Sequence, residues 1–65
     1  MRPYTFGGRE FDLDRPILDR FGNEWVDTGE HNTVGARTFE GGPDGEHFGW
    51  PLNLVSFMYG PLTQP

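Results

Sequence analysis

The chain has 65 residues, with ten acidic side chains, five arginines, no lysine and a formal net charge of −5 at pH 7. A chain of this length forms one domain and buries only about 60% of the surface that its unfolded state exposes. The absence of cysteine excludes disulfides, thiolate metal sites and cysteine nucleophiles. The acidic balance disfavours direct nucleic-acid binding, because phosphate groups require a basic surface.

The apolar content is concentrated in ten aromatic residues: six Phe, two Tyr and two Trp. Each aromatic side chain can bury about 150–250 Å², so a few of them suffice for the core of a small domain. No segment approaches the ~20 consecutive apolar residues of a membrane span. The N-terminal residues also lack the apolar region of a signal peptide, so we expect a cytoplasmic protein without a membrane partner.

Residues 1–15 are predicted as either an N-terminal hairpin or an extended arm. Two short β-prone runs, residues 4–6 and 9–11, flank the pair Gly7-Gly8. Glycine adopts positive φ angles without steric cost, so the pair suits a two-residue hairpin turn. The arm is the alternative, because the first residues of a domain are ordered only where other residues hold them.

A second hairpin is predicted over residues 16–28. The carboxylate of Asp19 can accept hydrogen bonds from backbone N–H groups across the turn, and Gly22 or Asn23 suits its left-handed position. The flanking residues are mostly of the β-branched and aromatic types that favour strands. This turn is the clearest local signal in the chain.

Residues 33–40 are predicted as a third strand, which a loop over residues 28–32 precedes. Gly35 weakens this strand and indicates a bulge. The following residues, 41–49, are predicted as a loop. Their Pro-Asp-Gly sequence combines a fixed φ, a capping side chain and tolerance of positive φ.

Residues 50–60 are predicted as one short helix. Pro51 suits the first helical position, and Gly60 suits the position after the end. Only Asn53 and Ser56 are polar within it, so its apolar arc is wider than one sheet face requires. The alternative is a strand, which the terminal proline and glycine disfavour.

The predicted fold is α+β: a small antiparallel sheet of three to four strands in meander order, with one C-terminal helix packed on it. Residues 1–65 form a single domain, in which residues 16–40 make the sheet. The helix over residues 50–60 is expected to cover the sheet. The residues expected in the core are Ile17, Leu18, Trp25, Val26, Val34, Phe39, Trp50, Leu54, Val55 and Met58.

No residue pattern indicates catalysis or a cofactor. His31 and His47 lack the short spacing of a zinc motif. The acidic run over residues 10–19 does not match a calcium loop, because Pro16 takes the fifth position counted from Asp12 and no glycine follows it. We therefore expect a protein that is not an enzyme and binds no metal or other cofactor.

Four short segments share a pattern with a known group of proteins. They are Phe-Asp-Leu-Asp-Arg-Pro at residues 11–16, Asp-Arg-Phe-Gly-Asn-Glu-Trp at residues 19–25, Thr-Gly at residues 28–29 and Tyr-Gly-Pro-Leu-Thr at residues 59–63. In these segments the chain resembles small uncharacterised proteins of actinobacterial phages and prophages. The resemblance implies a phage-type accessory protein in the host-cell cytoplasm or the virion. The resemblance implies no enzymatic activity and assigns no functional residue.

The surplus of aromatic and apolar residues beside an acidic surface favours a non-enzymatic protein that binds a host or phage protein. One alternative is a self-assembling structural or minor virion component, because a homo-oligomer would cover the wide apolar arc of the helix. Another is an acidic nucleic-acid mimic that inhibits a DNA-binding protein. The candidate interaction residues are Phe48, Trp50, Phe57 and Tyr59.

Overall fold

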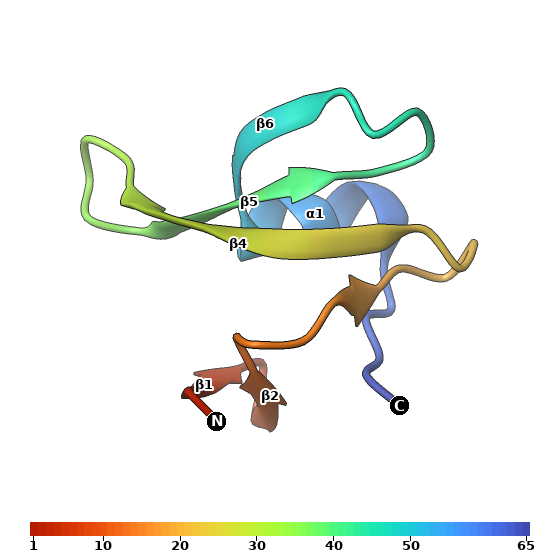
Figure 1. The fold of residues 1–65 in the computed structure, drawn as a ribbon, viewed down its shortest axis with the longest axis horizontal. Coiled ribbons are helices and arrows are strands. Elements are labelled where there is room, and N and C mark those ends of the chain that lie inside the picture. The colour runs from red at the N-terminus through yellow and green to blue at the C-terminus, as the bar shows by residue number, and fades with distance from the viewer.

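The computed structural model describes residues 1–65 and contains six strands and one helix (Figure 1). These elements are β1 (Pro3–Phe6), β2 (Arg9–Asp12), β3 (Ile17–Leu18), β4 (Glu24–His31), β5 (Arg37–Gly41), β6 (His47–Pro51) and α1 (Leu52–Tyr59). Strands β1 and β2 form a two-stranded antiparallel sheet, and a second sheet has the order β3-β4-β5-β6. The predicted α+β fold, an antiparallel meander with a C-terminal helix, is therefore confirmed.

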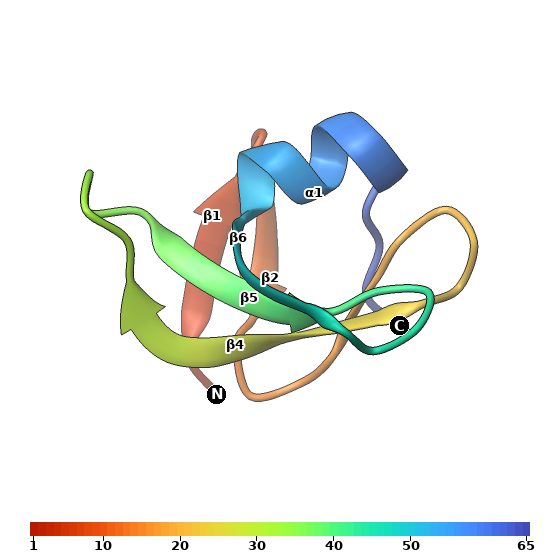
Figure 2. The ribbon, with the colours of Figure 1, turned by 90° about the horizontal axis from the view of Figure 1, so that it is seen from above.

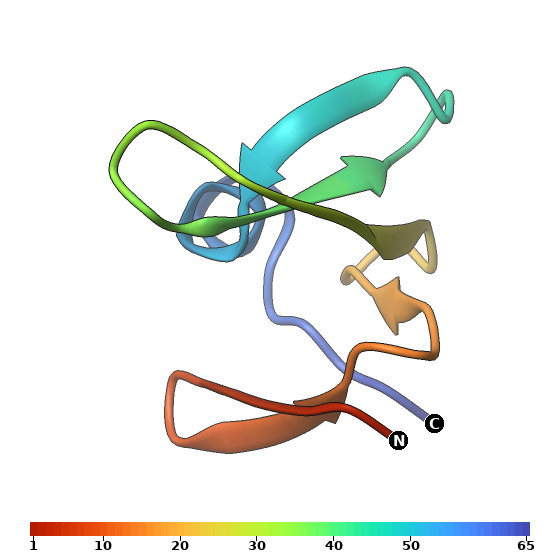
Figure 3. The same ribbon diagram turned by 60° about the vertical axis from the view of Figure 1, so that its left-hand side comes forward.

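The helix and the first hairpin lie on the same side of the four-stranded sheet. Helix α1 lies against one face of β5 and β6, and no other segment covers the opposite face (Figures 1 and 2). The β1–β2 hairpin shares no strand pair with the large sheet but packs on its core, with the Tyr4 and Phe39 ring centroids 6.2 Å apart, and the C-terminal residues run between the two sheets (Figure 3). The structure contains no helix whose length and apolar character would suffice to span a membrane.

The C-terminal residues join the two sheets, which share no strand pair of their own. Leu18 and Thr63 exchange two backbone hydrogen bonds, each 2.8 Å long. The side-chain amide of Gln64 accepts a hydrogen bond from the backbone N–H of Asp12 and donates one to its carbonyl, both at 2.7 Å. Leu62, between these contacts and the helix, is buried in the core. The tail therefore connects the two sheets through one isolated β-bridge and one side-chain amide.

Trp25 is the largest fully buried side chain and lies at the centre of the core. Its indole N–H donates to a carboxylate oxygen of Asp19 at 3.2 Å. Asp19, also buried, accepts further hydrogen bonds from the backbone N–H groups of Phe21 and Asn23, both at 2.9 Å, and from the Asn23 amide at 3.2 Å. The turn predicted from these residues thus closes around one carboxylate.

Gly42 makes close packing over Trp25 possible. Its φ of +92° lies in the left-handed region, where residues with a side chain are strained. A Cβ atom at this position would lie 3.0 Å from Cζ2 of Trp25 and 2.9 Å from Nδ1 of His47. The glycine-rich segment therefore has a packing role as well as a turn role.

The predicted loop over residues 41–49 and the predicted helix over residues 50–60 are wrong in their boundaries. Strand β5 runs to Gly41, β6 spans His47–Pro51, and α1 begins only at Leu52. The helix starts later than predicted because Pro51 is extended, with φ −69° and ψ 154°, and precedes the first turn. The loop was predicted in place of β6 because of a bulge at Gly49, whose φ is +79°. Between the flanking pairs Phe39↔Trp50 and Gly41↔His47, β6 advances three residues and β5 only two. The extra residue breaks the period-two alternation by which a strand is recognised.

The predicted third strand over residues 33–40 is also displaced. Strand β4 continues to His31, and β5 begins only at Arg37. The side chain of Asn32 accepts hydrogen bonds from the backbone N–H groups two and four residues later, at 3.1 and 2.9 Å. These bonds make residues 32–36 a tight turn, so Gly35 lies in that turn and not in a strand bulge.

The predicted core is partly right. Four of its residues are fully buried: Ile17, Trp25, Phe39 and Val55. Four others are exposed: Val26, Val34, Leu54 and Met58. The core instead includes four residues that were not expected in it: Phe11, Leu13, Leu52 and Leu62. The reason is that the core forms against the first hairpin and the tail as well as between sheet and helix.

We expect Asp19→Ala to lower the free energy of unfolding by about 3 kcal/mol, because it leaves several buried donors without an acceptor. Urea denaturation followed by tryptophan fluorescence measures the effect. Asp44→Ala is the matched control, since Asp44 is exposed in the loop after β5. It should change stability by less than about 0.5 kcal/mol. Equal losses in the two variants would contradict a central role for Asp19.

Burial opposes ionisation of Asp19, but the hydrogen bonds from Asn23, Trp25 and Phe21 outweigh it and hold the pKa of Asp19 below its ordinary value. The stabilisation from the ionised carboxylate is fully present above the unfolded pKa of about 3.9 and is lost as the pH falls through the folded pKa. The wild-type free energy of unfolding should therefore fall below pH ~4, and it should fall less in Asp19→Asn. Urea denaturation across that pH range tests this, and identical pH profiles would refute it.

Candidate functional site

The four residues predicted to contact a partner do not form one patch. Phe57, on α1, is 84% exposed, and Phe48, on β6, is 62% exposed. Trp50 and Tyr59 are only partly exposed and stack on each other, with ring centroids 6.0 Å apart and an interplanar angle of 30°. Two of the four predicted residues therefore have a packing role, and the other two lie on separate elements.

Four rings form what we term the aromatic cluster: Trp25, His47, Trp50 and Tyr59. The centroid of Trp25 lies 5.6 Å from that of Trp50 and 5.7 Å from that of Tyr59. His47 meets Trp50 edge-on, at 4.6 Å and 83°. Such tilted and edge-to-face contacts are the favoured geometries of aromatic pairs. The cluster fixes the C-terminal end of α1 against β4 and β6.

His47 is the least satisfied polar side chain in the cluster. Its Nδ1 atom is buried without a hydrogen-bond partner, and its Nε2 atom lies 3.4 Å from the hydroxyl of Tyr59. The Gly49 bulge explains the position, because it turns His47 and Trp50 to the same face of β6. Sequence reasoning placed His47 in a loop and missed this contact. No three His, Asp or Glu side chains are grouped so that they could hold a metal ion.

Helix α1 buries only one side. Successive residues are offset by about 100° around a helix, so Leu52, Val55 and Tyr59 share the side that faces the core. The opposite side carries one polar residue, Asn53, and three apolar residues. These three define the outward face of α1: Leu54 (38% exposed), Phe57 (84%) and Met58 (47%).

The outward face of α1 is unusual for a helix on a protein surface. Such helices normally present charged and polar residues to water. Helix α1 has no charged residue along its whole length. Phe21, in the turn after β3, is also exposed, and its ring meets that of Tyr59 edge-on at 6.4 Å. The expectation of an apolar arc too wide for one sheet face is therefore confirmed.

The uncovered face of the four-stranded sheet, which we term the outer face, is more mixed. Val26 pairs with Glu40 across β4 and β5, and the side chain of Val26 is exposed. Phe48 projects from β6 on this side, because the neighbouring His47 and Trp50 both face the core. Two exposed apolar residues beside a carboxylate make a smaller apolar surface than the outward face of α1.

The charged cluster around Asp27 stabilises the fold, and its carboxylate is already paired with two arginines. The side chain of Asp27 is 2% exposed and lies 3.1 Å from guanidinium nitrogens of both Arg2 and Arg37. Arg2 also binds Asp14 at 2.6 Å. The hydrogen bonds from Arg2 and then from the N-terminal ammonium lower the pKa of Asp14. These contacts attach the first residues of the chain to β4.

The packing role of Trp50 and the exposed position of Phe57 predict different effects of mutation on the free energy of unfolding. We expect Trp50→Ala to lower the free energy of unfolding by about 3 kcal/mol, because it removes a ring from the aromatic cluster. Phe57→Ala should change it by less than about 0.5 kcal/mol, because the ring is mostly in water. Urea denaturation measures both. A large loss for Phe57→Ala would show that its side chain is packed in solution.

Comparisons with protein-family models, with curated proteins and with solved structures find no significant match to this chain. The surfaces described above are therefore the basis for assigning a function.

Proposed function

We propose that the protein is a non-enzymatic binding protein that inserts the outward face of α1 into an apolar groove of a different protein. The supporting observation is that three of the four side chains on that side of the helix are apolar, with Phe57 84% exposed. Fully burying one exposed side chain of this kind contributes about 1.5–3 kcal/mol, and Leu54 and Met58 contribute less than Phe57 because they are already partly covered. A groove that covers all three therefore recovers free energy that the isolated domain leaves unused.

The spacing of the three residues matches this mode of binding. Leu54, Phe57 and Met58 stand at positions i, i+3 and i+4, the pattern by which amphipathic helices fill hydrophobic grooves. The helix is already held in place by its core contacts and by the aromatic cluster. A preformed helix loses less conformational entropy on binding than a segment that must fold.

Charge favours a different protein over a second copy of the chain. Each copy carries a formal charge of −5, so two copies repel each other, whereas a partner of net positive charge is attracted. A standard interface also buries about 800 Å² on each side, about a fifth of the 4067 Å² of accessible surface of this chain. A groove that encloses the helix reaches such an area more readily than a flat contact between two copies. With the resemblance to phage proteins, the partner is expected to be a host or phage protein.

The test compares two exposed phenylalanines. The chain is used to capture a partner from host lysate, and the purified partner is then titrated with wild type, Phe57→Asn and Phe48→Asn. We expect Phe57→Asn to weaken the Kd by about 30-fold, as for a hot-spot residue. Phe48→Asn, on the outer face of the sheet, is the matched control and should leave the Kd unchanged.

The other outcomes contradict the proposal in distinct ways. Loss of binding in Phe48→Asn alone would assign the partner to the outer face of the sheet. An unchanged Kd in both variants would exclude the outward face of α1 as the interface. Sedimentation velocity should show a monomer. A dimer that Phe57→Asn dissociates would identify a second copy as the occupant of the face.

A further inference from the structure

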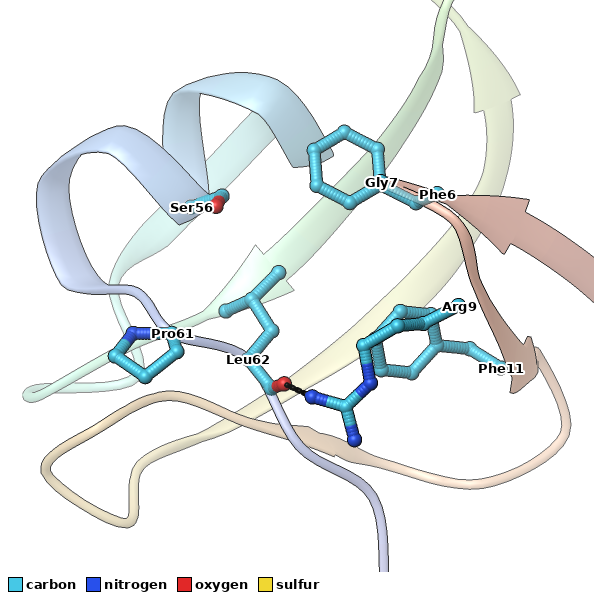
Figure 4. A pocket seen from close by; sticks show the side chains of 7 residues that line it. All are labelled: Phe6, Gly7, Arg9, Phe11, Ser56, Pro61 and Leu62. Atoms are coloured by element: carbon cyan, nitrogen blue, oxygen red, sulfur yellow. Dashed lines mark hydrogen bonds between the residues drawn. The ribbon is translucent and has the colours of Figure 1, made fainter.

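A pocket of about 160 Å³ lies between the turn of the β1–β2 hairpin and the C-terminal end of α1 (Figure 4). Its apolar walls come from Phe6 and Phe11 of the hairpin and from Leu62 of the tail. Two polar side chains also line it, Arg9 from β2 and Ser56 from α1, on opposite sides in Figure 4. The tail therefore creates a space in which apolar and polar groups converge.

The volume sets the size of the ligand. An apolar cavity of about 150 Å³ is large enough to hold a benzene molecule. Sites for drug-sized ligands are larger, about 300–1,000 Å³. The pocket therefore accommodates one six-membered ring or one branched aliphatic group, and because it is open to solvent on one side the rest of a ligand can extend out of it.

Arg9 sets the charge of the ligand. Its Nη1 atom donates to the carbonyl oxygen of Leu62 at 2.9 Å, and its guanidinium carbon lies 5.8 Å from the centroid of the Phe11 ring. These contacts hold the side chain at the pocket. Arg9 forms no ion pair, although acidic side chains outnumber basic ones ten to five. A guanidinium carries five N–H donors in a plane that matches a carboxylate, and only one nitrogen of Arg9 is engaged.

We propose that this pocket binds a carboxylate attached to one small apolar group, with the apolar group between Phe6, Phe11 and Leu62 and the carboxylate on Arg9. Two sources carry this chemistry: a free small carboxylic acid, and the C-terminal residue of another polypeptide. The site shares no residue with the outward face of α1. The test of this pocket is therefore independent of the partner protein proposed above.

The test is a ¹H–¹⁵N NMR titration of the full chain with 3-phenylpropionate and, separately, with the uncharged 3-phenylpropanol. We expect saturable shifts at Gly7, Arg9 and Leu62 with the acid, at a Kd on the order of 1 mM. The alcohol should bind about tenfold more weakly, because it cannot pair with the guanidinium. A short peptide ending in phenylalanine, with a free carboxylate or with a C-terminal amide, forms the second arm. Tighter binding of the acid or of the free-carboxylate peptide identifies the source.

Arg9→Gln should weaken binding of the acid about tenfold. Arg20→Gln is a closely matched control, because Arg20 also donates to a backbone carbonyl, that of Gly60, and lies 4.8 Å from a phenylalanine ring centroid, but it does not line the pocket. It should leave the Kd unchanged. If Arg9→Gln does not fold, as its NMR spectrum would show, the comparison of acid with alcohol on the unaltered chain still tests whether the pocket recognises a carboxylate. No saturable shift with either carboxylate, or equal binding of acid and alcohol, overturns the proposal.

Discussion

The hydrogen bond between the Trp25 indole and the Asp19 carboxylate is the contact on which the other parts of the structure depend. A buried indole N–H needs an acceptor, and a buried carboxylate needs several donors. The turn between β3 and β4 meets both needs at once, since its backbone N–H groups complete the shell around Asp19. Trp25 can then enter the core completely, and the sheet, the helix and the tail are organised around it.

The aromatic cluster connects Trp25 to α1 and orients the helix. The bulge at Gly49 directs two neighbouring rings of β6 towards Trp25, and Tyr59 completes the stack from the end of α1. The orientation of the helix about its own axis is thereby set. Once Leu52 and Val55 face the core, Leu54, Phe57 and Met58 must face water. The exposed apolar face is thus a consequence of the packing inside the domain.

The tail explains how a chain of this size encloses a pocket at all. It pairs with Leu18 on one side and with Asp12 on the other, and so holds the first hairpin close to the large sheet. The guanidinium of Arg9 donates to the tail carbonyl of Leu62 and so joins the hairpin to the tail beside the pocket. Two surfaces of different character result: an open apolar helix face, and a small pocket with one unpaired cation.

The sequence by itself determined the features that arise from local chemistry. The turn around Asp19, the pairing potential of Gly7-Gly8 and the wide apolar arc of the helix follow from side-chain geometry and spacing over a few residues. Only the tertiary structure decided where β6 lies, because the Gly49 bulge hides its alternation. It also decided that the aromatic candidates divide between packing and exposed roles, and that Arg9 meets Leu62, since contacts across about fifty residues depend on how the whole chain packs.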